Sequence, residues 1–74
     1  MNKRRVRLAG IVSGETVNIE VSLDIFEKIT KLAISTGDKR FYCTSKIFSK
    51  ISERGQQITE ETVNQYLEEE KAYA

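Results

Sequence analysis

The sequence predicts an α+β fold in which a two-stranded antiparallel β-hairpin packs against two or three helices. Apolar and polar residues alternate over most of the first 22 positions, as in strands, and apolar residues recur at helical spacing thereafter. The length of 74 residues leaves room for one small domain, residues 1–74. We expect strands over residues 4–12 and 16–22 and helices over residues 23–36, 44–54 and 59–72.

A turn at Ser13-Gly14 joins the two predicted strands, because glycine readily takes the positive φ that a two-residue hairpin turn requires. Closing the chain at this turn pairs residues whose numbers sum to 27. The pairs include Val6 with Val21, Leu8 with Ile19 and Arg7 with Glu20. A shift by one residue would move every apolar side chain to the other face, so the apolar pattern specifies this register.

The first predicted helix has capping residues at both ends. Ser22 is a favourable N-cap, Asp24 places negative charge in the first turn, and Gly37 suits a left-handed C-terminal position. The apolar stripe of this helix consists of Ile25, Phe26, Ile29, Leu32 and Ala33. Leu23 and Ile34 lie about 120–140° away from the centre of that stripe. They are either isolated surface residues or a second contact face, such as a dimer would require.

The second and third helices are expected to follow a polar and aromatic connection over residues 38–43. Thr44 or Ser45 would begin the second helix and Thr59 would cap the third, because short hydroxyl side chains favour N-cap positions. The residues expected to face the core are Ile47, Phe48 and Ile51 in the second helix and Val63, Tyr66 and Leu67 in the third.

The composition argues against catalysis and against bound cofactors. The chain has no histidine and a single cysteine, Cys43, so it lacks a Ser-His-Asp or Cys-His nucleophile and a His/Cys ligand set for zinc. It also contains no phosphate-binding loop and no calcium-loop motif. We therefore expect no enzyme activity, no cofactor, no metal and no small-molecule substrate, and we interpret Cys43 as a buried apolar residue.

Charge is distributed unevenly along the chain. Residues 1–54 contain eleven Lys and Arg against six Asp and Glu, a net of +5, whereas residues 55–74 contain five acids and one lysine, a net of −4. The basic part is suited to a polyanion or to an acidic protein. Apolar runs reach only three residues, so we expect no membrane-spanning segment and a cytoplasmic location.

Two groups of basic residues are candidates for nucleic-acid contact. The basic arm leads into the hairpin and consists of Lys3, Arg4, Arg5 and Arg7. The second basic cluster lies next to Phe41 and Tyr42 and consists of Lys39, Arg40, Lys46, Lys50 and Arg54. Lysine and arginine suit phosphate groups, and a half-exposed Tyr42 suits stacking on a base. The same charges are equally consistent with solvated surface that has no specific partner.

Residues 17–37 resemble the strand and first helix of ribbon–helix–helix DNA-binding proteins, both in the length from strand to terminating glycine and in the apolar stripe of the helix. The resemblance implies that the strands of two copies pair in a dimer and place alternate side chains in the DNA major groove. The matching positions are Thr16, Asn18 and Glu20. Of these, Asn18 is suited to bind an adenine edge.

These observations predict a small, non-catalytic binding protein. The leading hypothesis is a nucleic-acid-binding regulator that acts as a homodimer through its basic hairpin. The alternative is a protein-interaction or inhibitor module with no role in nucleic-acid binding. In that alternative, the acidic third helix engages a basic partner, or Leu23 and Ile34 form the contact.

Overall fold

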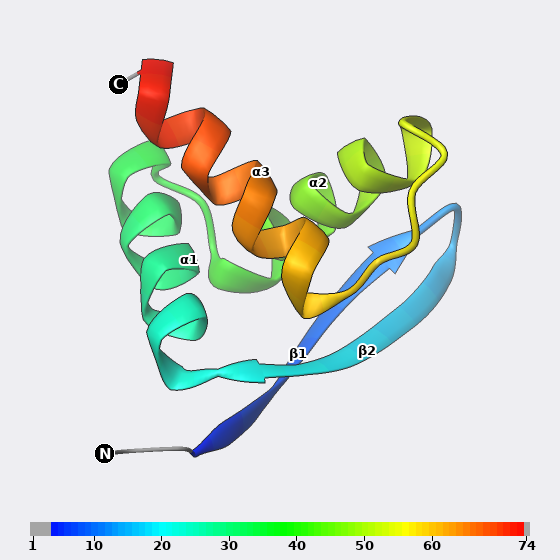
Figure 1. Ribbon diagram of the computed structural model, residues 1–74, viewed down its shortest axis with the longest axis horizontal. Helices are drawn as coiled ribbons and strands as arrows, with labels where there is room; N and C mark the ends of the chain where they lie inside the picture. Colours follow the sequence, from blue (N-terminus) through cyan, green and yellow to red (C-terminus); the bar gives the residue numbers. More distant parts are fainter. Residues whose placement is uncertain (1–3, 74) are drawn as a thin grey trace.

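Within residues 4–73, one hairpin and three helices make up the fold, which is the predicted α+β class (Figure 1). The computed structural model describes residues 4–73, with side chains described through residue 70. The elements in chain order are β1 (Arg5–Val12), β2 (Glu15–Ser22), α1 (Leu23–Thr36), α2 (Arg40–Glu53) and α3 (Glu60–Tyr73). All three helices lie on one side of the hairpin (Figure 1).

The hairpin has the register that the sequence predicts. β1 and β2 are antiparallel, with Val6 opposite Val21 and Leu8 opposite Ile19. Ser13 and the following glycine have φ values of 51° and 79°, so both central residues of the turn are left-handed. This is the type I′ arrangement, whose twist matches that of the strands it connects.

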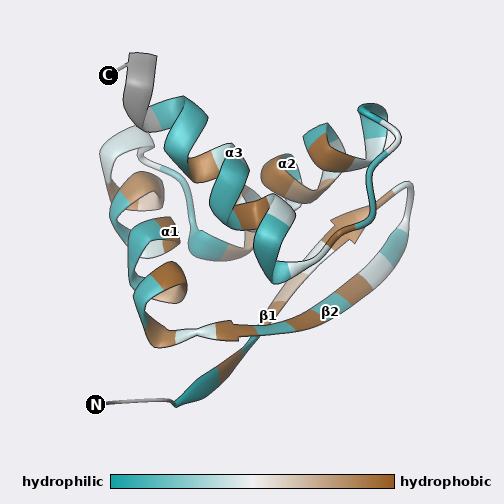
Figure 2. Ribbon diagram, in the orientation of Figure 1, coloured by the Kyte–Doolittle hydropathy of each residue, from teal (hydrophilic) through white to brown (hydrophobic). Residues whose placement is uncertain are grey.

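The core lies between the hairpin and the helices. Figure 2 shows apolar residues on the sides of the elements that face one another. The buried apolar side chains of the core are Leu8, Val21, Ile25, Ile29, Ala33, Cys43, Ile47, Phe48, Ile51, Val63 and Leu67. The core-facing residues predicted for α2 and α3 are among them, except that Tyr66 is only partly buried. The prediction that Cys43 is buried is also confirmed.

Gly10 allows α2 to approach β1 closely. A Cβ atom at this position would lie 3.0 Å from Cδ2 of Phe48 and 3.1 Å from the backbone N and Cα of Ser45. These distances are too short for an ordinary carbon contact, so a larger residue would push the helix away from the strand. The close approach of α2 to β1 therefore requires glycine at position 10.

The ends of α1 are those predicted from the sequence. The Ser22 side chain accepts a hydrogen bond from the backbone N–H of Ile25 at 3.3 Å, as an N-cap does. Gly37 has φ 76°, and the N–H group of the next residue, Asp38, reaches the carbonyl of Ala33 at 2.9 Å. These bonds satisfy backbone groups that the end of a helix leaves unpaired.

The start of α2 differs from the prediction, since the helix begins at Arg40 rather than at Thr44 or Ser45. The hydroxyl groups of Thr44 and Ser45 do not cap the helix. They donate to the carbonyl oxygens of Arg40 and Phe41, one turn earlier, at 2.8 and 2.9 Å. Lys39 occupies the N-cap position without a side-chain capping bond. The segment is helical because it buries Cys43 and Thr44 against the core, a tertiary effect that local capping signals do not contain.

The third helix packs across the other two through its apolar face. Its N-cap region contains Thr59, whose side chain accepts a hydrogen bond from the N–H group of Thr62 at 3.2 Å. Arg54, which follows α2, forms a two-pronged contact with Glu69 at 2.7 and 3.1 Å and lies over the ring of Tyr66 at 5.5 Å. These contacts fix the C-terminal part of α3 to the end of α2.

Candidate functional site

The open face of the hairpin is the side that points away from the helices. Its residues are Arg5, Arg7, Ala9 and Ile11 of β1 and Thr16, Asn18, Glu20 and Ser22 of β2. Most of these side chains are exposed, and the rest are half-buried. The alternation of residues along each strand therefore separates the core face from a polar face, as the sequence predicts.

The predicted basic arm is only partly available on the open face. Arg5 donates hydrogen bonds to Glu60 Oε1 and to the carbonyl oxygen of Glu20, both at 2.9 Å. Arg7 is exposed and lies opposite Glu20, but within residues 4–73 it forms no salt bridge. Arg4 is exposed at the start of the hairpin, and Lys3 lies outside the described residues. Arg7 is thus the arm residue best placed to meet a partner from this face.

The Ser22 end of the outer edge of β2 is covered by the first turn of α3. Glu60 accepts the backbone N–H of Ser22 at 2.8 Å through Oε2 while its Oε1 atom pairs with Arg5. The hydrogen bond from Arg5, and then that from Ser22, hold the pKa of Glu60 below its usual value. A carboxylate from α3 therefore covers the Ser22 end of the β2 edge, whereas the described residues supply no acceptor for the outward N–H groups of Thr16, Asn18 and Glu20.

The outer edge of β1 is defined by the N–H groups that point away from β2. In a hairpin with a two-residue turn, the residues next to the turn, Val12 and Glu15, exchange both hydrogen bonds, and such pairs alternate along the strands. The backbone N–H groups of Arg7, Ala9 and Ile11 consequently point away from β2.

The Ile11 end of this edge is covered by α2. The N–H group of Ile11 donates to Ser45 Oγ at 2.8 Å. For the N–H groups of Arg7 and Ala9, the described part of the chain supplies no acceptor. The edge of β1 is thus closed at one end and open over Arg7 and Ala9.

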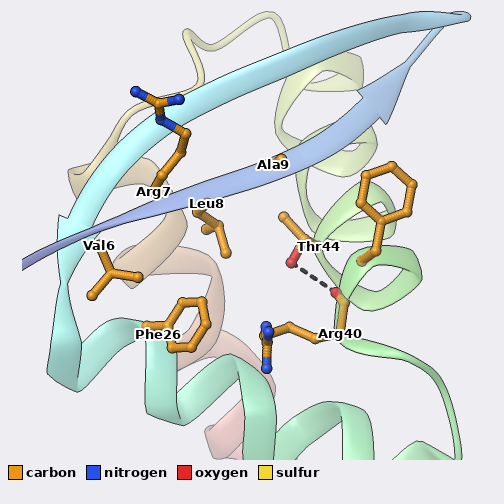
Figure 3. A pocket seen from close by; sticks show the side chains of 8 residues that line it. Val6, Arg7, Leu8, Ala9, Phe26, Arg40 and Thr44 are labelled. Carbon is orange, nitrogen blue, oxygen red and sulfur yellow. Dashed lines mark hydrogen bonds between the residues drawn. The ribbon is translucent and has the colours of Figure 1, made fainter.

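A groove of about 250 Å³, the edge groove, runs beside this open part of β1 (Figure 3). It is bounded by β1 and by the nearby parts of α1 and α2. Its lining consists of Val6, Arg7, Leu8, Ala9, Phe26, Arg40, Phe41 and Thr44. The lining contains two arginines and no acidic residue.

The edge groove is lined by one residue of each basic group, Arg7 of β1 and Arg40 of the first turn of α2. The Arg7 side chain points away from the groove, on the other side of β1 from Val6 and Leu8 (Figure 3). The Arg40 guanidinium lies 4.3 Å from the centre of the Phe26 ring, within the range of a cation–π contact. Phe26 belongs to the predicted core stripe but is only partly buried, because it lines the edge groove.

The rest of the second basic cluster lies along α2, beside a shallow hollow of about 460 Å³. Lys46 pairs with Asp38 at 2.9 Å, and Lys50 lies 3.9 Å from Glu53. The hydrogen bond from Lys46 lowers the pKa of Asp38. Both lysines are therefore partly balanced by acids of their own chain. Lys39 is exposed at the N-cap of α2.

Tyr42 is 57% exposed at the rim of the same hollow. Its ring meets that of Phe41 edge to face, with 5.9 Å between the ring centres. Phe41 itself is 40% exposed. The first turn of α2 thus presents two aromatic rings at the surface.

The two residues considered as a second contact face lie at opposite ends of α1. Leu23 is half-buried, whereas Ile34 is 75% exposed. Among the described residues, Ile34 is the most exposed of the large apolar side chains.

The described residues offer few groups suited to catalysis or to metal binding. Cys43 is buried, and burial raises the pKa of its thiol, which disfavours the reactive thiolate. Within the described residues no three His, Cys, Asp or Glu side chains are grouped so that they could hold a metal ion. No helix in this part of the chain is long and apolar enough to cross a membrane.

Comparison with known proteins leaves the site to be judged on its geometry, since no protein-family model, curated protein or solved structure matches the chain. Sequence reasoning did not find the edge groove or the role of Glu60. The groove depends on where α1 and α2 pass β1, and Arg5 and Glu60 are 55 positions apart. No local pattern signals either feature.

Proposed function

We propose that this protein is a non-catalytic DNA-binding regulator whose hairpin enters the major groove with its open face toward the bases. The observation that carries the proposal is an antiparallel ribbon with an uncovered face on which Arg7 and Asn18 are exposed diagonal neighbours. The major groove of B-DNA is wide enough to admit a two-stranded ribbon of this kind.

The side chains of the open face have the chemistry that base recognition requires. Arg7 can donate two hydrogen bonds to a guanine, and Asn18 can bind the donor and acceptor of an adenine. Thr16 and Ile11 can contact a thymine methyl group, and Glu20 can accept from a cytosine amino group. The positions at which the ribbon–helix–helix resemblance implies base contacts lie on this same face.

Phosphate contacts would come from the flanks of the ribbon. Arg4 and Arg5 precede the base-contacting residues on β1, and Arg5 would exchange its contact with Glu60 for one with phosphate. Lys46 and Lys50 are a weaker source of phosphate contacts, because each has an acid of its own chain within 4 Å.

The proposal includes a homodimer, because one short ribbon makes few base contacts and two copies would bind two half-sites. The exposed Ile34 supports a contact between the α1 helices of two copies. Light scattering should give twice the chain mass of 8.5 kDa at high concentration, and a mass of 8.5 kDa would remove the dimer from the proposal.

The test of DNA binding is a salt titration with a mixed-sequence duplex, using the wild-type protein and matched charge variants. We expect binding at low salt that weakens steeply as salt increases. Arg7→Ala should weaken binding by about fivefold or more, which corresponds to the loss of one good base contact. Lys31→Ala is the control, since it removes the same charge from the exposed surface of α1.

Two results would contradict the proposal. One is the absence of duplex binding at low salt. The other is an equal loss of affinity in Arg7→Ala and Lys31→Ala, which would mean that only the net charge of the protein matters.

The alternative, a protein-interaction module that uses the acidic third helix, has less support. Glu60 pairs with Arg5, Glu68 with Lys28 and Glu69 with Arg54. Much of the acidic surface of α3 is therefore balanced by cations of the same chain.

A further inference from the structure

We propose that the open edge of β1 binds a second polypeptide by strand addition, and that the partner is an extended peptide in which acidic and apolar residues alternate. This interface is separate from the open face proposed to meet DNA. It uses the backbone of Arg7 and Ala9 and the edge groove, whereas the open face uses side chains on the other side of the hairpin.

The backbone of β1 supplies the main-chain contacts. The outward N–H groups of Arg7 and Ala9 have no acceptor within residues 4–73, although Ser45 closes the edge at Ile11. An unpaired strand edge of this kind is a template for another extended segment. The added strand would lie about 4.8 Å from β1, the usual spacing of paired strands.

The edge groove accounts for the apolar residue of the partner. Side chains of an added strand alternate between the two faces of the sheet. A partner residue opposite Leu8 would project to the helix side, where the groove is lined by Val6, Phe26 and Phe41. The groove thus provides a site for one apolar side chain beside the open stretch of the β1 edge.

The charges around the edge account for the acidic residues. Partner residues on either side of the apolar one project to the open face, next to Arg7, which forms no salt bridge within residues 4–73. No acidic residue lines the groove. Alternating acidic and apolar residues therefore match both faces of the added strand.

The same charges argue against a second copy of this chain as the occupant. Antiparallel pairing of two β1 strands centred on Arg7 would place the Arg7 side chains directly opposite each other, and pairing centred on Leu8 would make them diagonal neighbours on the same face. Like charges in cross-strand positions are destabilising. An acidic segment removes this repulsion and replaces it with attraction.

The test uses the full chain and a short synthetic peptide of alternating glutamate and valine, followed by amide correlation spectra and fluorescence anisotropy. We expect the largest shifts at the amides of Arg7 and Ala9 and saturable binding. A peptide of alternating lysine and valine should bind at least about tenfold more weakly. No DNA is present, so the result does not depend on the proposed DNA binding.

Proline substitution distinguishes the two edges. Ala9→Pro removes the outward N–H group of the open edge, without removing a bond of the β1–β2 ladder, and should weaken peptide binding by at least about tenfold. Asn18→Pro is the matched control, because Asn18 lies opposite Ala9 and its N–H group points out of the β2 edge. It should leave peptide binding unchanged.

A charge exchange keeps the proposal testable if a proline variant fails to fold. Arg7→Glu should weaken binding of the glutamate–valine peptide and strengthen binding of the lysine–valine peptide, whereas Lys31→Glu should do neither. The proposal is overturned if neither amide shifts, if both proline variants bind equally, or if Arg7→Glu has no effect. It is also overturned if a short oligothymidine displaces the peptide and shifts the same amides, because the edge groove would then bind nucleic acid.

Discussion

The outward backbone groups of the two hairpin strands are covered at opposite ends, on β2 at Ser22 and on β1 at Ile11. On β2, Glu60 accepts the N–H group of Ser22, and Arg5 donates to the carbonyl oxygen of Glu20. On β1, the corresponding protection is a single bond from Ile11 to Ser45 at the end nearest the turn. Proteins usually cover strand edges, since an open edge invites pairing with other chains. Both edges keep outward N–H groups without an acceptor among the described residues, and the open part of β1 also lies beside the edge groove, so it is the better candidate for a binding edge.

The difference arises from how the helices are attached. Two helices meet the hairpin edges with polar side chains, α3 through Glu60 and α2 through Ser45. The α2 contact lies close to Gly10, where the helix approaches the strand most tightly. Past Gly10, towards Arg7, the first turn of α2 moves away from the strand edge and the groove opens (Figure 3). The comparison can be broken or sharpened by substitutions at these contacts.

The largest effect is expected at Gly10. Gly10→Ala places a methyl group within about 3.1 Å of Phe48 and the Ser45 backbone, so we expect a loss of about 2 kcal/mol in the free energy of unfolding. Chemical denaturation measures this loss. Ala9→Ser is the control on the open face, and an equal loss there would show that α2 does not pack tightly at Gly10.

The next effect is expected at the covered end of the β2 edge. Glu60→Ala removes the acceptor of the Ser22 N–H group and one of the two acceptors of Arg5. We expect the free energy of unfolding to fall by about 1 kcal/mol. Glu61→Ala is the matched control, because Glu61 is the next acid in the same turn and is exposed. Similar losses in the two variants would mean that Glu60 acts only through the helix dipole and does not cover the edge.

A smaller effect is expected at Ser45. Ser45→Ala removes the acceptor of the Ile11 N–H group, but alanine is the better helix former. We therefore expect the free energy of unfolding to fall by only about 0.5 kcal/mol. The more sensitive readout is faster hydrogen exchange at the Ile11 amide. Ser49→Ala, one turn later on α2, should leave that amide unchanged; if it accelerates exchange equally, the Ser45 contact does not protect the edge.

The smallest effect is a pH dependence that belongs to the covered end of the β2 edge. The pKa of Glu60 is lower in the folded chain than the ordinary glutamate value of about 4.3, because Arg5 and Ser22 hydrogen-bond its charged form. Its contribution to stability is therefore complete above the ordinary value and is lost as the pH falls through the lowered value. Unfolding measured over this acidic range should show a shallower decline for Glu60→Ala than for wild type, and identical slopes would contradict the assignment.

Much of the fold is predictable because its signals are local. Ser13-Gly14, Ser22 and Gly37 mark the turn and both ends of α1, and the alternation around Leu8 and Ile19 sets the register. The start of α2 is not predictable in this way. Thr44 and Ser45 resemble capping residues in the sequence, but their hydroxyl groups bond one turn back inside the helix.

The candidate site is predictable only where it follows the strand alternation. That alternation places Arg7 and Asn18 on one face. The edge groove is formed by residues of β1, α1 and α2, and the salt bridge between Arg5 and Glu60 connects residues that are 55 positions apart. These features come from the packing of distant segments, which no local spacing encodes.

Residue-resolved amide hydrogen exchange tests most directly whether the β1 edge is open over Arg7 and Ala9. The amides of Ser22 and Ile11 have acceptors and should exchange slowly, whereas the outward amides of Arg7 and Ala9 should exchange orders of magnitude faster, although all four belong to the same hairpin. Protection of Ala9 equal to that of Ser22 would show that the β1 edge is already covered, and it would contradict the account.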